Sequence, residues 1–335
     1  MTALLEIEVL TARLPGEGEL RAVLHDVSLT IGAGEAVGLV GESGSGKSMT
    51  ARAVGRLLPG GAQTTGSVRF DDREVLDLRG AVLRRYREQV AMIFQDPRAH
   101  VNPVRKIGDF MTEMLRMHGI SGADAAQDAA RALRAVGIDD GARRLEQYPH
   151  ELSGGLLQRV MIATVLLGEP RLVLADEPTT ALDVTTQSEV MAILDELRHK
   201  RGLSLLFITH DLELAAAVCD RTAVMYAGQI VETNAAGLLD REPLHPYTAA
   251  LAGARPDIAA STHRLAAIPG RPVSAFEAPD GCAFAPRCAF AEDACRAARP
   301  PLETLGGGEV RCRRARELRG RLPSAIRDPS EASRA

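Results

Sequence analysis

Eight consecutive residues decide how this sequence is expected to fold: Gly41-Glu42-Ser43-Gly44-Ser45-Gly46-Lys47-Ser48. They follow an apolar run of strand length and precede a segment with helix-forming residues. Glycines let a backbone turn successive N–H groups inward, and the start of the following helix completes a cradle for phosphate. In such a loop Lys47 is expected to reach the β- and γ-phosphates of a nucleotide, and the Ser48 hydroxyl to ligate Mg²⁺. A glycine-rich turn with an accidental Lys-Ser pair is the alternative, which the full match between a strand and a helix disfavours.

A pair of acidic residues fits the same chemistry. Arg171 precedes a continuous apolar run over residues 172–175, typical of a buried parallel strand, and Asp176 and Glu177 follow it directly. Ligands of doubly wound folds bind at this carboxyl end of the sheet. We therefore expect Asp176 to hold the magnesium ion and Glu177 to act as the general base that polarises the attacking water. The alternative is a solvated acidic strand end.

A third apolar run ends in Thr209-His210-Asp211. A lone histidine is more often structural than catalytic. At the end of a core strand, however, His210 is placed to contact a γ-phosphate, and we predict that role for it.

With two further segments, the chain resembles the ATP-hydrolysing subunits of ABC transporters, specifically those of oligopeptide, dipeptide and nickel importers. These segments are Met92-Ile93-Phe94-Gln95-Asp96-Pro97 and Leu152-Ser153-Gly154-Gly155. The resemblance implies an α/β fold of the P-loop NTPase type, with a RecA-like core, an antiparallel β subdomain and a helical subdomain. It covers about three-quarters of the chain as a general ATPase. The last quarter matches only the peptide and nickel branch.

The resemblance also assigns roles to these segments. Gln95 would contact Mg²⁺, take part in the reaction and begin the surface that faces the membrane partner. Ser153, Gly154 and Gly155 would form a second anion site that caps the ATP of another subunit in a head-to-tail dimer. Asp183 would tune the junction between the two subunits. Hydrolysis would then require two sandwiched nucleotides.

Two positions depart from the family pattern. Leu156 stands where glutamine is frequent, a mild departure because the peptide branch varies there. The aromatic ring that usually stacks on adenine has no counterpart, since no Phe, Tyr or Trp precedes Phe70. Leu14 is expected to take its place, which predicts weaker discrimination between ATP and GTP.

The length of the chain and its segments rich in proline and glycine predict the domain organisation. With 335 residues, the chain is long for one domain. We predict an ATPase domain over residues 1–235, with a helical subdomain over about 97–165, and a C-terminal extension over 236–335. Within the helical part, Ser121 with Asp124 predicts a capped helix start, and Gly137 a helix end. His245-Pro246-Tyr247 is expected to begin the extension, with a structural His245 and a Tyr247 whose hydroxyl stays in contact with water.

Four of the five cysteines gather in the extension: Cys282, Cys288, Cys295 and Cys312. Clustered thiols in a cytosolic protein favour a metal over disulfides, and zinc or an iron–sulfur cluster are the chemical options. The spacings lack the close Cys-x-x-Cys pairs of structural zinc sites. Resemblance to dipeptide-importer ATPases implies a [4Fe–4S] cluster, and four reduced thiols are the alternative.

The composition of the chain limits its possible partners and its location in the cell. The net charge of −4, without basic clusters rich in aromatics, predicts no nucleic-acid partner. We find no apolar run long enough for a membrane helix and no basic N-terminal region typical of a signal peptide. The phosphate loop and the acidic pair predict ATP and Mg²⁺ as cofactors, and the resemblance implies a peripheral location at the cytoplasmic face of the cell membrane.

The expected partners are a second ABC ATPase, either a copy or a paralogue, two membrane permease subunits and, indirectly, an extracellular or periplasmic substrate-binding protein. Peptide import is the function predicted. The alternatives are import of nickel or another small solute, and a non-transport ABC ATPase.

Overall fold

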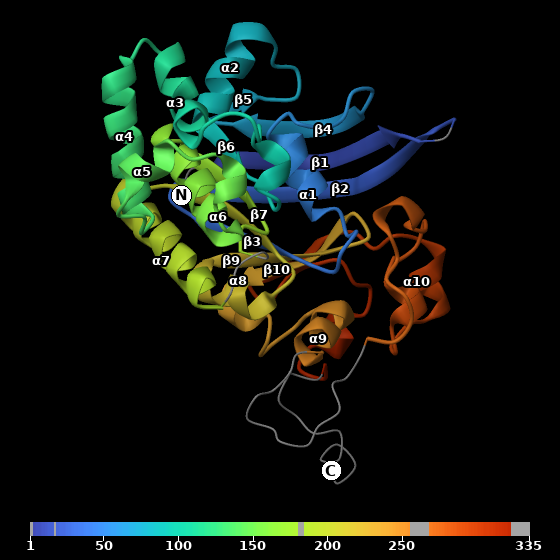
Figure 1. The fold of residues 1–335 in the computed structure, drawn as a ribbon. Helices are drawn as coiled ribbons and strands as arrows, with labels where there is room; N and C mark the ends of the chain where they lie inside the picture. The colour runs from blue at the N-terminus through green and yellow to red at the C-terminus, as the bar shows by residue number, and fades with distance from the viewer. Residues whose placement is uncertain (1–2, 17, 180–183, 255–267, 323–335) are drawn as a thin grey trace. The chain divides into compact units, whose positions relative to one another are not determined.

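The computed structural model describes residues 3–16, 18–179, 184–254 and 268–322 (Figure 1). By the contacts of its backbone, the chain divides into two compact units. The first takes most of its residues from 77–208, and the second from 3–31, 36–76 and 209 onward.

The second unit contains an antiparallel sheet in the order β2-β1-β4-β5. Its strands are β1 (Ala3–Pro15), β2 (Leu20–Gly32), β4 (Gln63–Phe70) and β5 (Arg73–Glu74). The register between β1 and β4 shifts between Glu8 and Thr11, where Val9 adopts a φ of 49°. A bulge of this kind adds local twist to a strand. This sheet agrees with the antiparallel β subdomain implied by the resemblance.

The same unit holds a second run of strands in the order β11-β12-β10-β9-β3. Here β3 (Ala36–Val40) pairs in parallel with β9 (Arg221–Tyr226), and β10 (Gln229–Ala235) pairs antiparallel with β9. The short strands β11 (Glu303–Leu305) and β12 (Gly308–Val310) follow, with β12 paired to β10. Residues from the predicted extension therefore continue the sheet that begins with the strand before the phosphate loop.

Short helices complete the second unit. They are α1 (Lys47–Val54), α8 (Leu212–Val218), α9 (Pro246–Gly253), α10 (Asp293–Ala297) and α11 (Ala315–Leu318), with 3₁₀ turns η3 (Ala236–Leu238), η4 (Ala275–Glu277) and η5 (Ala285–Arg287). Tyr226, Tyr247 and Phe284 lie in one buried cluster, with ring centroids 4.5 to 5.4 Å apart. Such aromatic groups bury large apolar areas. They join strand β9 to the segment that follows residue 236.

The first unit contains the parallel strands β8 (Ser204–Thr209), β7 (Leu172–Asp176) and β6 (Val90–Ile93), in that order. Every residue of β7 and β8 is buried. Continuous apolar runs are typical of strands that are covered on both faces. Helices α2 (Gly80–Gln89) and α7 (Val184–Arg201) belong to this unit.

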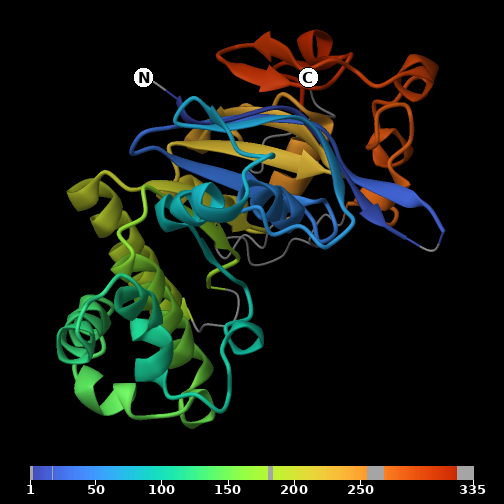
Figure 2. The same ribbon diagram turned by 90° about the horizontal axis from the view of Figure 1, so that it is seen from above.

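Four helices fall within the predicted helical subdomain: α3 (Ile107–Met117), α4 (Gly122–Ala135), α5 (Gly141–Leu145) and α6 (Gly154–Leu167). They contact one another and form the green group of helices in Figure 2. The Ser121 hydroxyl accepts a hydrogen bond from the Asp124 N–H, so the predicted start of α4 is confirmed. The chain leaves this helix at Gly137, which has a φ of 75°. Among the described residues, no helix combines the length and apolar character needed to span a bilayer.

Candidate nucleotide site

The phosphate loop (residues 41–48) connects a buried strand to a helix, as predicted. All five residues of β3 are buried, and α1 begins at Lys47. Gly46 precedes the helix with a φ of 103°, a conformation that other residues rarely adopt. A Cβ atom on Gly41 would lie 2.1 Å from the carbonyl oxygen of Met225. The glycines at these two positions are therefore required by backbone geometry.

The Lys47 side chain is held at the base of this loop. Lys47 is 5% exposed, and its Nζ donates to the carbonyl oxygens of Gly41 at 2.7 Å and Glu42 at 3.1 Å. Ser48 lies half-buried in the first turn of α1, whereas Ser43 and Gly44 are exposed. A charged ammonium at the start of a helix, beside the backbone amides of a glycine-rich loop, is a suitable site for nucleotide phosphates.

Asp176 and Glu177 lie where β7 ends in the first unit. Asp176 is 3% exposed and pairs with Ile208 of β8. Glu177 is half-buried and has a φ of 46°, while its N–H donates to the Ile208 carbonyl oxygen at 3.0 Å. A left-handed conformation at a residue other than glycine costs free energy and is concentrated at functional sites. It sets the direction of the Glu177 side chain.

Gln95 contacts Glu177 in this unit. Its Nε2 donates to Glu177 Oε2 at 3.0 Å, although 82 residues separate the two positions. Gln95 follows β6 and is exposed, and the neighbouring Phe94 ring stacks on His100 with centroids 3.7 Å apart. The structure therefore places two of the predicted catalytic residues within hydrogen-bond distance.

His210 belongs to the second unit and directly follows β8. It is exposed, and the next residue caps helix α8, because the Asp211 carboxylate accepts hydrogen bonds from the N–H groups of Glu213 and Leu214. The position at the end of a core strand agrees with the sequence analysis. Asp183 lies outside the described residues.

The predicted signature segment (residues 152–155) starts helix α6. Ser153 is exposed, and its hydroxyl accepts a hydrogen bond from the Leu156 N–H at 3.3 Å. Gly154 and Gly155 form the first turn and are half-buried, with no atom within 4 Å of a Cβ built on Gly154. Leu156 is half-buried in the same turn. The segment thus has the geometry of a capped helix start open on one side.

The four cysteines of the C-terminal segment line one pocket, together with His245 and Phe284. We call it the cysteine pocket; its cavity volume is about 20 Å³. Burial raises the pKa of Cys282 and Cys288, and that of Cys312 to about 11. Within the described part of the chain, no three His, Cys, Asp or Glu side chains lie close enough together to hold a single metal ion.

The His-Pro-Tyr segment differs in one respect from prediction. His245 is structural, as expected: it is 1% exposed, and its Nδ1 accepts the Tyr247 N–H at 3.0 Å to cap helix α9. The Tyr247 hydroxyl, however, does not contact water. Tyr247 is fully buried, and its hydroxyl oxygen accepts the Glu42 N–H at 3.0 Å. Folding brings the phosphate loop next to this side chain, and no local sequence pattern predicts that contact.

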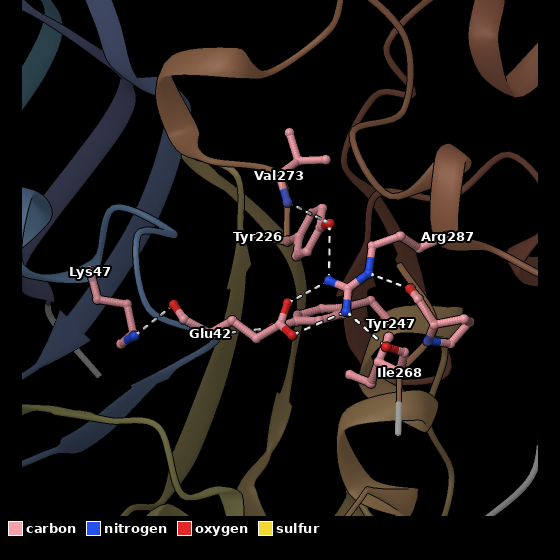
Figure 3. A network of polar contacts seen from close by, with 8 residues as sticks. Glu42, Lys47, Tyr226, Tyr247, Ile268, Val273 and Arg287 are labelled. Atoms are coloured by element: carbon pink, nitrogen blue, oxygen red, sulfur yellow. Dashed lines mark hydrogen bonds and ion pairs between the residues drawn. The ribbon is translucent and has the colours of Figure 1, made fainter. Parts of the chain in front are cut away.

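Sequence reasoning missed three residues around the phosphate loop: Glu42, Arg287 and Tyr226. Figure 3 shows Glu42 between Lys47 on one side and Arg287 on the other, with the Tyr226 hydroxyl beside the guanidinium. Leu14, which was predicted to cover adenine, lies half-buried near the end of β1. Its role stays a prediction.

Comparison with known proteins places this geometry in a family. A model described as "ABC transporter" matches residues 24–180, and one described as the C-terminal region of oligopeptide/dipeptide transporters matches residues 231–295. The chain is 42% identical to the oligopeptide transport ATP-binding protein OppD of Haemophilus influenzae, over 93% of this chain and 97% of the relative. It is 44% identical to OppD of Salmonella typhimurium over 88% of each chain.

Solved structures agree on the fold. The dimeric ATP-binding cassette MJ0796 in a post-hydrolysis state bound to ADP and Pi superimposes with a TM-score of 0.63 and 28% identity, over 69% of this chain and 98% of that one. CbiO1 of Clostridium perfringens, part of an ABC transporter complex, gives a TM-score of 0.60 at 25% identity, over 70% of this chain and 89% of that one. The chain therefore belongs to the family of ABC transporter ATP-binding proteins, in its oligopeptide and dipeptide branch.

Proposed function

We propose that this ATPase powers the import of dipeptides and oligopeptides across the cytoplasmic membrane, as a peripheral subunit on its cytoplasmic face. The observation that carries the ATPase part is the buried Lys47 ammonium at the start of α1, held by the carbonyl oxygens of the phosphate loop. The C-terminal region shared with oligopeptide transporters and the names of the relatives support peptides as cargo. The partners are two permease subunits and a second ATPase.

In this proposal the loop amides and Lys47 bind the β- and γ-phosphates, while Ser48, Asp176 and Gln95 are the magnesium ligands. Hydroxyl, carboxylate and amide oxygens are the donors that Mg²⁺ prefers. The metal neutralises charge on the phosphates when it is bound. Because Ser48 sits in the first turn of α1 and Asp176 at a strand end, both are placed on rigid elements.

Glu177 is proposed to accept the proton of the attacking water. The hydrogen bond from Gln95 Nε2 orients its carboxylate, and a general base must be held within reach of the proton that it takes. His210 is proposed to hydrogen-bond the γ-phosphate, and Asp183 to adjust the subunit junction. Ser153, Gly154 and Gly155 are proposed to cap the nucleotide of the partner subunit, which fits their position at an exposed helix start.

The cysteine pocket is proposed to hold a [4Fe–4S] cluster on Cys282, Cys288, Cys295 and Cys312. All four thiols line this pocket, and a cubane with four irons spreads its thiolates more widely than one metal ion does. The absence of a single-ion geometry in the described residues is therefore compatible with a cluster. Since burial raises the thiol pKa values, loading must release protons from neutral thiols. The cluster would supply a structural cross-link.

Anaerobic purification followed by iron and sulfide analysis tests the cluster. We expect four irons per chain, and loss of the iron in Cys288→Ser. Cys219→Ser is the matched control, because Cys219 lies at the end of α8 rather than along the cysteine pocket. If the protein purified under these conditions contains neither iron nor zinc, the cluster is ruled out.

Affinity purification from the native membrane tests the transport function. Tagged Glu177→Gln protein, kept in ATP to hold the closed state, should recover two multi-spanning permeases and a second ATPase. Its hydrolysis rate should be at least about 100-fold below wild type, whereas Glu196→Gln on the exposed face of α7 should keep full activity. Reconstitution with the binding protein should show stimulation by peptides and not by Ni²⁺. Recovery of DNA-repair or ribosomal proteins without a permease would overturn the proposal.

A further inference from the structure

The phosphate loop is contacted from behind by residues that lie more than 200 positions further along the chain. The Tyr247 hydroxyl, on helix α9, accepts the Glu42 N–H at 3.0 Å. The Arg287 guanidinium, at the end of turn η5, donates to both carboxylate oxygens of Glu42 at 2.7 and 3.2 Å. The Ala275 N–H donates to the Gly44 carbonyl oxygen at 3.2 Å. All these residues belong to the second unit.

The Arg287 guanidinium makes further hydrogen bonds besides those to Glu42. Its Nε donates to the Pro269 carbonyl oxygen at 2.8 Å, and its two terminal nitrogens donate to the Tyr226 hydroxyl at 3.3 Å and the Ile268 carbonyl oxygen at 3.4 Å (Figure 3). With the two bonds to Glu42, these contacts use the planar fork of donors that a guanidinium offers. The Arg287 side chain is 4% exposed. Its position is therefore set by contacts within the protein, not by solvent.

Every polar group of Glu42 has a partner as a result. Its carboxylate binds Arg287, its N–H binds Tyr247, and its carbonyl oxygen accepts from Lys47 Nζ at 3.1 Å. A continuous chain of contacts thus leads from the C-terminal segment to the ammonium that is to meet the phosphates. Burial acts to lower the pKa of Arg287, but the hydrogen bonds to Glu42 and Tyr226 outweigh it and raise the pKa above its ordinary value. The Arg287 guanidinium therefore stays charged at physiological pH.

We propose that Arg287 and Tyr247 are positioning residues of the nucleotide site, which hold Glu42 so that the phosphate loop is in its binding conformation before ATP arrives. The inference rests on the proposed binding of ATP at this loop. A loop with glycines at positions 41, 44 and 46 has many accessible conformations when it is free. Affinity falls in proportion to the fraction of molecules whose loop is competent to bind. Contacts that fix one loop residue on three sides raise that fraction without touching the nucleotide.

Binding of Mg-ATP to the full-length chain tests this role. We expect Arg287→Met to raise the Kd for ATP by about tenfold, because the unpaired Glu42 releases the loop. Arg287→Lys should recover part of the affinity, and Tyr247→Phe should raise the Kd by about threefold, since one hydrogen bond is lost. Arg271→Met is the matched control: Arg271 pairs with Glu277 in the same segment, but its side chain is 78% exposed.

A second measurement distinguishes a positioning role of Arg287 from a purely structural role. In the assembled transporter, Arg287→Met should raise the KM for ATP while kcat at saturating ATP stays within about twofold, because bound nucleotide re-imposes the loop conformation. A folded Arg287→Met protein, with a cooperative melting transition, that binds ATP as wild type does would overturn the inference. If that variant does not fold, Tyr247→Phe decides, since it keeps the ring packing and deletes only the acceptor; an unchanged Kd in it would equally refute the role. A wild-type chain that binds no ATP would instead refute the proposed function.

Discussion

Helices α1 and α6 both begin with glycine-rich segments that are predicted to meet a nucleotide phosphate, yet their first turns are completed differently. Before α1 stands Gly46, which has no side chain to offer, so no side-chain cap completes the first turn of this helix. Before α6 stands Ser153, whose hydroxyl accepts the Leu156 N–H. The first turn of α1 thus lacks a side-chain cap, whereas that of α6 is capped by a serine of its own chain.

Their surroundings differ in the same sense. The phosphate loop is held from behind by buried side chains, with Arg287 4% exposed and Tyr247 fully buried. Ser153 is exposed, and nothing lies within 4 Å of a Cβ built on Gly154. The contrast suits the proposed division of labour, in which the phosphate loop binds ATP alone and the signature segment acts only when a second subunit presents its nucleotide.

Removal of Lys47 should produce the largest effect. Lys47→Ala should weaken ATP binding by the isolated chain about 100-fold, because charge-assisted hydrogen bonds worth about 3 kcal/mol are lost. Ser153→Ala should leave this affinity unchanged, and Lys106→Ala, in an exposed ion pair with Glu146, serves as the control for charge. Equal losses in the Lys47 and Ser153 variants, measured by calorimetry, would erase the distinction between the two helix starts.

Two buried groups near Tyr247, Glu232 and His245, should make opposite contributions to the pH dependence of the free energy of unfolding. Burial raises the pKa of Glu232 to about 7, and burial lowers the pKa of His245 to about 3. Glu232 therefore stabilises the fold fully below pH 4.5 and loses this contribution as pH rises to 7. His245 contributes fully above pH 6.5 and loses its contribution as pH falls towards 3. Between pH 4.5 and 6.5 the two effects on the free energy of unfolding oppose each other.

Single substitutions should separate the two contributions to the pH dependence of the free energy of unfolding. From pH 4.5 to 6.5, the free energy of unfolding of Glu232→Gln should increase by about 2.7 kcal/mol relative to wild type, because the opposing contribution of Glu232 is removed. His245→Asn keeps a side chain that can cap α9, and it should show a decrease of similar size. Urea denaturation at several pH values measures both. Parallel slopes in the two variants would contradict the assignment of these groups.

Alanine at the glycines of the two helix starts should have effects of opposite sign. Gly46→Ala should lower the free energy of unfolding by about 2 kcal/mol, because it forces a side chain into a φ of 103° and brings its Cβ to 3.0 Å from Met225. Gly154→Ala should raise it by up to about 0.5 kcal/mol, since the site is open and alanine favours a helix. Chemical denaturation of both variants checks this. A destabilised Gly154 variant would mean that the signature segment is as constrained as the phosphate loop.

A modest change in stability should come from loss of the side-chain cap of α6. Ser153→Ala should cost about 1 kcal/mol, because the Leu156 N–H loses its acceptor, whereas Ser153→Thr should keep most of the stability. Hydrolysis by the two-chain complex should fall more in the alanine variant than in the threonine one. If hydrolysis is unaffected while the stability falls, the hydroxyl serves the helix and not the partner's nucleotide.

Much of the site could be predicted because its signals are local. The glycines of residues 41–48, the apolar runs before Asp176 and His210, and the Ser121 cap each act over a few neighbouring positions, and the structure places strands and helices there. Tyr247 shows the limit of such reasoning. An exposed hydroxyl was expected from the side chain's amphipathic character, but this one is buried against the phosphate loop. Gln95 was linked to the magnesium site only by resemblance.

The sequence by itself determined the phosphate loop and the strand ends that carry Asp176, Glu177 and His210, because glycine geometry and apolar runs are encoded residue by residue. The family followed from the resemblance of the motifs. Tertiary structure alone decided which distant groups meet. Glu42 and Arg287 are 245 positions apart, Glu42 and Tyr247 are 205 apart, and four separate cysteines line one pocket. Such pairings arise when buried polar groups find partners during packing. No spacing in the sequence marks them, since the chain between the partners is free to vary in length.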